Sequence, residues 1–245
     1  MKRRDFVTGT LFAAGMSACE PQNPAEEINL PVSQDIFEWK MATSWPLGLP
    51  GLGVGATNFA KRAEKASGGR LKIKVFAGGE LVPDMEVLDA VRRGTVQIGH
   101  DPSYYHRGKI AWADYFTTVP FGLNVNEMNA WLYYGGGLDL WHELYDPLNL
   151  VPFPVGNTGV QMLGWFNKKI QSINDLSGMK IRMPGLGGEI MQRAGAIQVT
   201  VPGSEIFTSL KTGVVDAAEW VGPYNDRSLG LHEAARYYYY PGFHE

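Results

Sequence analysis

The feature that most constrains the fold is an internal echo. The segment EVLDAVRRGTVQIGH at residues 86–100 and the segment EIFTSLKTGVVDAAE at residues 205–219 share one pattern, offset by 119 positions: a glutamate, an apolar helix face, a basic residue, a glycine and a short strand. Tandem repeats have periods of roughly 20 to 50 residues, so this spacing predicts two lobes of similar build rather than a solenoid. The alternative is chance, because helix–glycine–strand units are common in α/β proteins.

Strand and helix patterns alternate along the chain. Period-2 or apolar runs predict strands, and apolar residues three or four apart predict helices. The predicted strands cover 37–45, 70–79, 95–100, 160–167, 179–184 and 197–203, and the predicted helices cover 54–69, 84–94, 125–146 with a break at Gly135–Gly137, and 187–195. This order predicts an α/β fold with crossover helices on a sheet.

Composition narrows the function. With 22 Lys and Arg against 25 Asp and Glu, the net charge is -3 and the pI is about 6.0, which gives no basic face for nucleic acid. Cys19 is the single cysteine, so neither an intrachain disulfide nor a multi-cysteine metal site is available. Any metal must therefore be held by oxygens or histidines.

The N-terminus has the composition of an export signal. Residues 1–19 combine three early basic residues, a short apolar run and small residues before Cys19, and the run is too short to span a bilayer. KRRDF is similar to a twin-arginine motif and MSAC to a lipobox, which would put a lipid on Cys19. Residues 20–36 follow as a proline-bearing linker. The alternative is a frayed amphipathic start.

The segment KIRMPGLGGEI at residues 180–190 places Arg182 at the end of a strand, just before a helix start. A guanidinium there either points to water or, if buried, needs an anionic partner, and free N–H groups at a helix start also favour an anion. Residues 48–56 carry a glycine run spaced G-x-G-x-G, which is not the dinucleotide fingerprint. No metal-ligating histidine spacing or nucleophile elbow is present, so the residues favour binding over catalysis.

The echo also predicts where a ligand would lie. Ligands of open α/β sheets bind beyond the carboxyl ends of strands. The segments that leave the two echoed strands, 100–105 and 219–225, would face each other across an interlobe cleft. Their aromatic and polar side chains suit a small organic anion, and the candidates are Tyr104, Tyr105, Glu219, Trp220, Tyr224 and Asn225.

Long runs of the chain, from about Phe37 onward, resemble the extracytoplasmic solute-binding subunit of tripartite ATP-independent periplasmic (TRAP) transporters. Among them are FEWKMATSWPLGLPGLG, PVGNTGVQMLGWFN, KIRMPGLGGE and AAEWVGPYNDRSLGLHEAARYYYYPGFHE. The resemblance is nearest to the branch that binds 2-oxo acids such as pyruvate. It implies a two-lobed periplasmic binding protein fold with an interlobe cleft, which passes a carboxylate to TRAP membrane subunits and performs no covalent chemistry.

The resemblance also implies roles for individual residues. Arg182 matches the signature arginine that grips the ligand carboxylate, and this interpretation requires a guanidinium held inside without an internal acidic partner. A sodium ion, ahead of calcium, would touch ligand oxygens and protein oxygens. Its implied protein ligands are Gln161, Glu219, the main-chain carbonyl of Trp220, and Glu245. The implied substrate-binding residues are Arg182, Gln161, Tyr104, Tyr105, Trp220 and Asn225.

The expected domain plan is a signal at 1–19, a linker at 20–36, lobe 1 at 37–155 and lobe 2 at 156–245. Because the family is longer, lobe 2 is expected to be incomplete and the C-terminal part missing, which puts in doubt the homodimer that the resemblance implies. The expected location is the periplasm, either free or anchored through Cys19. Two alternatives stay open: an exported α/β enzyme acting on a small carboxylate, and a lipoprotein scaffold without a small ligand.

Overall fold

The protein is described by a computed structural model covering residues 34–244. The predicted export signal, Cys19, most of the predicted linker and Glu245 lie outside the described residues.

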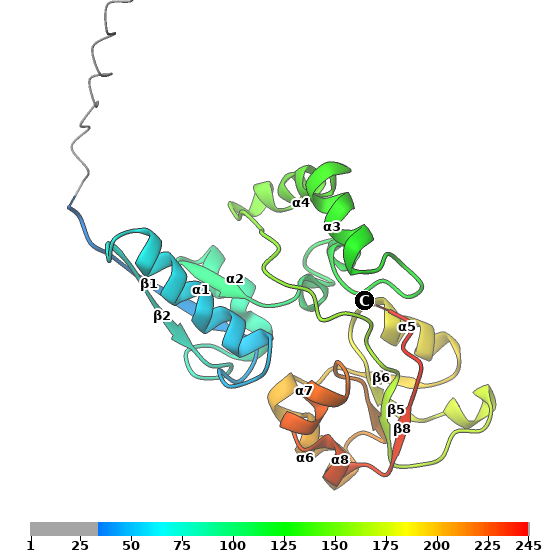
Figure 1. Cartoon of the computed structure of the whole chain (residues 1–245). Coiled ribbons are helices and arrows are strands. Elements are labelled where there is room, and N and C mark those ends of the chain that lie inside the picture. Colours follow the sequence, from blue (N-terminus) through cyan, green and yellow to red (C-terminus); the bar gives the residue numbers. More distant parts are fainter. Residues whose placement is uncertain (1–33, 245) are drawn as a thin grey trace, which may run out of the picture. The chain divides into compact units, whose positions relative to one another are not determined.

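The first lobe is built on a three-stranded parallel sheet (Figure 1). Its strands, in the order β2-β1-β3, are β1 (Phe37–Thr43), β2 (Leu71–Phe76) and β3 (Ile98–His100). Crossover helices α1 (Leu52–Ala66) and α2 (Val87–Arg92) connect them, and a 3₁₀ turn, η1 (Asp84–Glu86), precedes α2. Parallel strands need such crossovers, and this explains the alternating pattern read from the sequence.

Helical segments follow the first sheet. They are η2 (Ser103–His106), η3 (Ala113–Phe116), α3 (Val125–Tyr134), α4 (Gly137–Tyr145) and η4 (Asp146–Leu148). The predicted break between two helical pieces is confirmed at Gly135–Gly136. Asn124 starts α3 with a capping box: its side chain accepts from the N–H of Glu127, whose carboxylate accepts in return from the N–H of Asn124.

The second lobe is built on a five-stranded mixed sheet in the order β6-β5-β7-β4-β8. The strands are β4 (Gly164–Phe166), β5 (Lys180–Arg182), β6 (Ile197–Val199), β7 (Ala217–Ala218) and β8 (Tyr237–Tyr239). The helical segments are η5 (Ile173–Leu176), α5 (Gly185–Arg193), η6 (Gly203–Glu205), α6 (Ile206–Thr212), α7 (Pro223–Ser228) and α8 (Leu231–Ala234). Strand β5 runs parallel to β6 and β7, whereas β4 runs antiparallel to β7 and β8.

The echo predicted from the sequence is confirmed as structure. Each copy is a 3₁₀ turn, a short helix, a glycine and a strand: η1–α2–β3 in the first lobe and η6–α6–β7 in the second. Gly94 and Gly213 hold equivalent positions after the helices, with φ of 71° and 76°. Only glycine adopts this left-handed backbone at little cost, which is why both copies carry it. The fold is therefore the predicted two-lobed α/β architecture.

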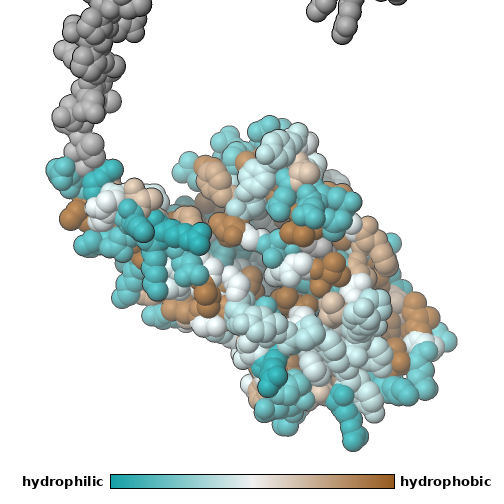
Figure 2. Space-filling model, viewed as in Figure 1, coloured by the Kyte–Doolittle hydropathy of each residue, from teal (hydrophilic) through white to brown (hydrophobic). Residues whose placement is uncertain are grey.

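The surface shows no single chemical character. On the face drawn in Figure 2, hydrophobic residues are interspersed with hydrophilic ones. Several large side chains are exposed, among them Phe121 and Tyr134. Within residues 34–244, none of the helices has both the length and the apolar character needed to traverse a bilayer.

Candidate functional site

Arg182 lies at the carboxyl end of β5, where the predicted cleft was expected. Sheet register pairs Arg182 with Val199 on one side and with Ala218 on the other, so the next residue of that neighbouring strand, Glu219, lies beside it. The Arg182 residue is 1% exposed and Glu219 is 2% exposed. A charged pair this deeply buried is costly unless each group is well partnered.

The guanidinium of Arg182 uses all three of its nitrogens. Nε donates to the carbonyl of Val201 (3.1 Å), and Nη1 donates to the carbonyl (2.7 Å) and to Oε2 (3.2 Å) of Glu219. Nη2 donates to the hydroxyl of Tyr105 (3.2 Å). The expectation of a guanidinium without an internal acidic partner is therefore wrong. The reason is the register of β5 and β7, which brings Glu219 alongside Arg182.

Only one carboxylate oxygen of Glu219 has a hydrogen-bond partner among the described residues. Oε2 meets Arg182, whereas Oε1 is buried and has no hydrogen-bond partner among the described residues. Burial raises the pKa of this carboxyl to about 8; the charge of Arg182 opposes that rise and Asp226 adds to it. A buried oxygen left unpaired costs about 1–3 kcal/mol, or more when charged. Glu219 Oε1 is therefore a candidate atom for contact with a ligand or cation.

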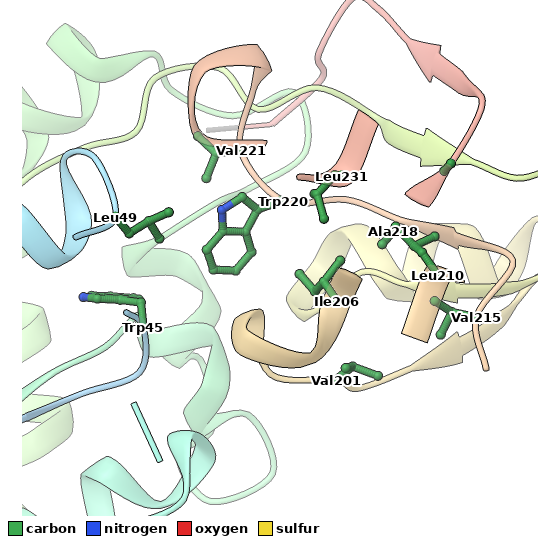
Figure 3. Close-up of a cluster of buried hydrophobic side chains, with 11 residues drawn as sticks. Trp45, Leu49, Val201, Ile206, Leu210, Val215, Ala218, Trp220, Val221 and Leu231 are labelled. Carbon is green, nitrogen blue, oxygen red and sulfur yellow. The ribbon is translucent and has the colours of Figure 1, made fainter. Parts of the chain in front are cut away.

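The Trp220 ring packs beside Arg182. The Arg182 guanidinium carbon lies 5.3 Å from the centre of its ring. The ring packs in a cluster with Trp45 and Leu49, which come from the loop between β1 and α1 in the first lobe (Figure 3). The cluster thus joins the two lobes at the site. The indole N–H groups of Trp45 and Trp220 are both buried without a partner within residues 34–244.

Tyr104 and Tyr105 come from η2, immediately beyond β3. Their rings meet edge to face with centroids 5.0 Å apart. Burial raises the pKa of both phenols, so both stay protonated at neutral pH. Next to them, His106 is hydrogen-bonded to Tyr145 (Nδ1, 2.7 Å) and to Asp101 (Nε2, 2.8 Å). This buried network fixes the turn that presents Tyr105 to Arg182.

Tyr104 also contacts the second lobe. A methyl group added at Gly185, the first residue of α5, would lie 3.1 Å from Tyr104 Cβ. The structure therefore brings Tyr104, Tyr105, Arg182, Glu219 and Trp220 together; their roles in binding stay a prediction.

Gln161 and Asn225 make no hydrogen bond to Arg182 or Glu219 among the described residues. The Gln161 amide donates to Thr158 Oγ1 (2.8 Å), and the next residue, Met162, bonds through its N–H to the carbonyl of Val221 (3.0 Å), one position from Trp220. Asn225 is partly buried, and its Oδ1 lacks a partner in the described part of the chain. Tyr224, also expected at the cleft, is instead 76% exposed, since its position in α7 turns it to solvent.

Sequence reasoning missed Asp226. Its Oδ1 accepts from the N–H groups of Val221 (3.1 Å) and Gly222 (2.9 Å), and its Oδ2 accepts from Trp165 Nε1 (2.9 Å). These bonds hold the chain that follows Trp220. An acidic residue in the first turn of a helix started by Pro223 was the available signal.

The neighbours of His244 were also not predicted from the sequence. It is buried, its carbonyl accepts from the N–H of Gln161 (2.8 Å), and its Nδ1 has no partner in the described range. Burial lowers its pKa to about 4, so the imidazole is neutral at neutral pH. Its place beside Gln161 results from chain crossing, which local patterns do not encode.

The donor set favours a hard cation over a transition metal. Across residues 34–244, no three His, Cys, Asp or Glu side chains form a metal-binding group. Glu219 is the one carboxylate of the predicted set within this range, and the other two predicted ligands, Gln161 and the Trp220 carbonyl, are neutral oxygens. Carboxylate and carbonyl oxygens suit sodium or calcium.

Comparisons with known proteins match this chain to one family. Residues 45–245 match the DctP family, described as bacterial extracellular solute-binding protein, family 7. A monocarboxylate 2-oxoacid-binding periplasmic protein of Nostoc is 47% identical over 245 residues, which is 100% of this chain and 67% of that protein.

Two solved structures are also similar. A TRAP periplasmic solute-binding protein of Pseudoalteromonas atlantica with bound sodium and pyruvate has a TM-score of 0.82 at 41% identity, over 85% of this chain and 64% of that one. One from Colwellia psychrerythraea with bound calcium and pyruvate has a TM-score of 0.82 at 42% identity, over 86% and 64%. This chain spans slightly less than two thirds of both structures. The chain belongs to the DctP family of bacterial extracellular solute-binding proteins.

Proposed function

We propose that this protein is the extracytoplasmic solute receptor of a TRAP transporter and binds a small 2-oxo monocarboxylate, such as pyruvate, together with a cation. The family consists of solute-binding proteins rather than enzymes. The observation that carries the proposal is Arg182, 1% exposed and held by both lobes through Val201 and Tyr105. Similarity to relatives described with pyruvate supports this choice of ligand.

The ion pair of Arg182 with Glu219 gives a physical reason for the cation. Above the pKa of about 8 of Glu219, the guanidinium and the carboxylate sum to zero charge in a buried site; below it, a cation bound at Oε1 would take the place of the carboxyl proton. With Glu219 ionised, a ligand carboxylate entering alone would add one uncompensated negative charge, which a low-dielectric site opposes strongly. A cation entering with the ligand restores neutrality.

The cation would be held by Glu219 Oε1, the oxygen that has no partner within residues 34–244, with Gln161 and the Trp220 carbonyl as neutral donors. When bound, it would draw the carboxylate and keto oxygens of the ligand to one point. This favours a 2-oxo acid over a plain monocarboxylate. We propose sodium as the ion; relatives described with sodium and with calcium keep both in the test.

The receptor is proposed to act in the periplasm and to deliver its ligand to TRAP membrane subunits, in line with the periplasmic relatives. Export by the twin-arginine route, lipidation of Cys19 and a homodimer stay predictions.

A ligand panel tests the proposal. Pyruvate, lactate and propionate are added to the protein in sodium chloride, and thermal unfolding is followed. Pyruvate at about 100 times its Kd is expected to stabilise the fold by roughly 2.7 kcal/mol, with smaller effects from lactate and propionate. Pyruvate should be recovered unchanged, and recovery of a product would favour the alternative of an enzyme.

Two variants separate binding from general damage. Arg182→Met is expected to abolish the pyruvate shift, because the cationic partner of the ligand carboxylate is gone. Lys180→Met, two residues earlier on β5 and exposed, removes one positive charge of the same strand and should keep the shift. Equal shifts in wild type and Arg182→Met would overturn the assignment.

A further inference from the structure

A hydrogen bond between the side chains of Ser204 and Asp84 joins the two lobes. The hydroxyl of Ser204 donates to Oδ2 of Asp84 over 2.8 Å. Asp84 begins η1, the turn before α2, and Ser204 lies in η6, the turn before α6. The two turns are the equivalent parts of the echoed units, so the bond joins the two copies at matching places.

Asp84 is held by contacts within the first lobe. It is 4% exposed, and its main-chain carbonyl accepts from the hydroxyl of Ser44 (2.7 Å), the residue after β1. A methyl group added at Gly78 would lie 2.5 Å from Asp84 Oδ1 and 2.9 Å from the nitrogen of Trp45. The carboxylate is thus packed against the strand end that carries Trp45.

Gly203, the residue before the exposed Ser204, packs against the other tryptophan. A methyl group added at Gly203 would lie 2.5 Å from Cη2 of Trp220. The hydrogen bond therefore ties together the turns that flank Trp45 and Trp220, which share one apolar cluster (Figure 3). The two turns belong to different lobes, and neither lies on the connecting segment between η4 and β4. The distance between the two turns therefore depends on the relative positions of the two lobes.

The bond has an energetic role that follows from burial. Oδ1 of Asp84 has no partner among residues 34–244, and burial raises the pKa of this carboxyl. Without Ser204, both oxygens of a buried carboxylate would lack a side-chain donor. Separation of the lobes would hydrate the group instead. Ser204 therefore offsets part of the desolvation that the joined arrangement imposes on Asp84.

We propose that the Asp84–Ser204 hydrogen bond is a latch that holds the two lobes in the arrangement seen here, which makes both residues positioning residues for ligand retention. Neither residue touches the Arg182–Glu219 pair in any of the hydrogen bonds described above. The part concerning retention rests on the proposed function; the part concerning the lobes does not.

The lobe arrangement is measured without ligand. Spin labels are placed at Lys61→Cys on α1 and Thr208→Cys on α6, both exposed, in a Cys19→Ser background, and the distance between them is measured by double electron–electron resonance. Ser204→Ala is expected to move population to longer distances, and Ser204→Thr, which keeps a hydroxyl, to restore the wild-type distribution. Ser228→Ala, which removes an exposed hydroxyl of the same lobe, is the control. A Ser204→Ala distribution identical to wild type, or an equal change in the control, would overturn the latch.

Ligand release provides the second readout. With pyruvate as the probe, dissociation followed by tryptophan fluorescence is expected to be roughly 3- to 30-fold faster in Ser204→Ala, as fits one hydrogen bond to a charged group at the edge of the site. If pyruvate does not bind the wild type, the proposed function fails while the distance measurement still decides the latch. If pyruvate binds and leaves both proteins at one rate, the role in retention is refuted.

Discussion

Replacing Glu219 by glutamine separates the two charges of the site. At about pH 9, above the pKa of about 8 of Glu219, Glu219→Gln leaves Arg182 buried without its carboxylate partner, which lies 3.2 Å away in the wild type. Removing one member of a buried pair costs about 3–5 kcal/mol. The variant is therefore expected to unfold at a markedly lower urea concentration than the wild type. Glu233→Gln, the same change at an exposed carboxylate of the same lobe, should unfold at the same urea concentration as the wild type.

The same variant should lose its need for a cation. At about pH 9 Glu219 is ionised in the wild type. At a separation of about 4 Å, its carboxylate and that of the ligand would repel by about 4 kcal/mol at an effective dielectric constant of 20, a factor of roughly 1,000 in affinity if no cation intervenes. In Glu219→Gln, the ligand carboxylate alone neutralises Arg182.

Calorimetric titration of pyruvate in sodium chloride and in potassium chloride with a chelator measures the difference. The wild type is expected to bind at least about 100-fold more weakly without sodium or calcium, and the variant less than about 10-fold more weakly. If Glu219→Gln keeps the full cation dependence of the wild type, the charge argument is refuted.

Three further predictions concern stability. Gly164→Ala should prevent stable folding, because its φ is 112° and a methyl group would lie 2.3 Å from the carbonyl oxygen of Ala218; circular dichroism would show it. Gly203→Ala should cost about 1–3 kcal/mol in urea unfolding by pushing the Trp220 ring, and an unchanged midpoint would show that the ring can yield. Burial lowers the pKa of His100 to about 4 from an ordinary 6.5, so the unfolded chain binds a proton that the folded chain does not. Stability should fall as pH drops from about 6.5 to about 4, and His100→Gln should flatten that fall by at most about 1.4 kcal/mol per pH unit.

Local patterns were enough for much of the fold. Alternation predicted the strands that became β1 and β2, and the echo predicted two helix–glycine–strand units. Strand β8 was missed, because Tyr237–Tyr240 is a run of one residue type with no period for a face to be read from. Its strand character comes from pairing with β4, which is tertiary information.

The site was predicted in part for a similar reason. The position of Arg182 at a strand end and the aromatic exits are local, and the structure brings them together. The ion pair with Glu219 depends on which strand neighbours β5 and in what register. The latch between Asp84 and Ser204 depends on how two lobes meet. No single segment of the sequence predicts either of these two contacts.

The most direct test of the account is the mutual dependence of cation and ligand. The Kd of pyruvate is measured at several sodium concentrations, and the Kd of sodium at several pyruvate concentrations, with calcium as a parallel series. Each ligand is expected to tighten the binding of the other by the same factor, because the pair of Arg182 with an ionised Glu219 must take both charges together. Pyruvate binding that is indifferent to both cations would contradict it.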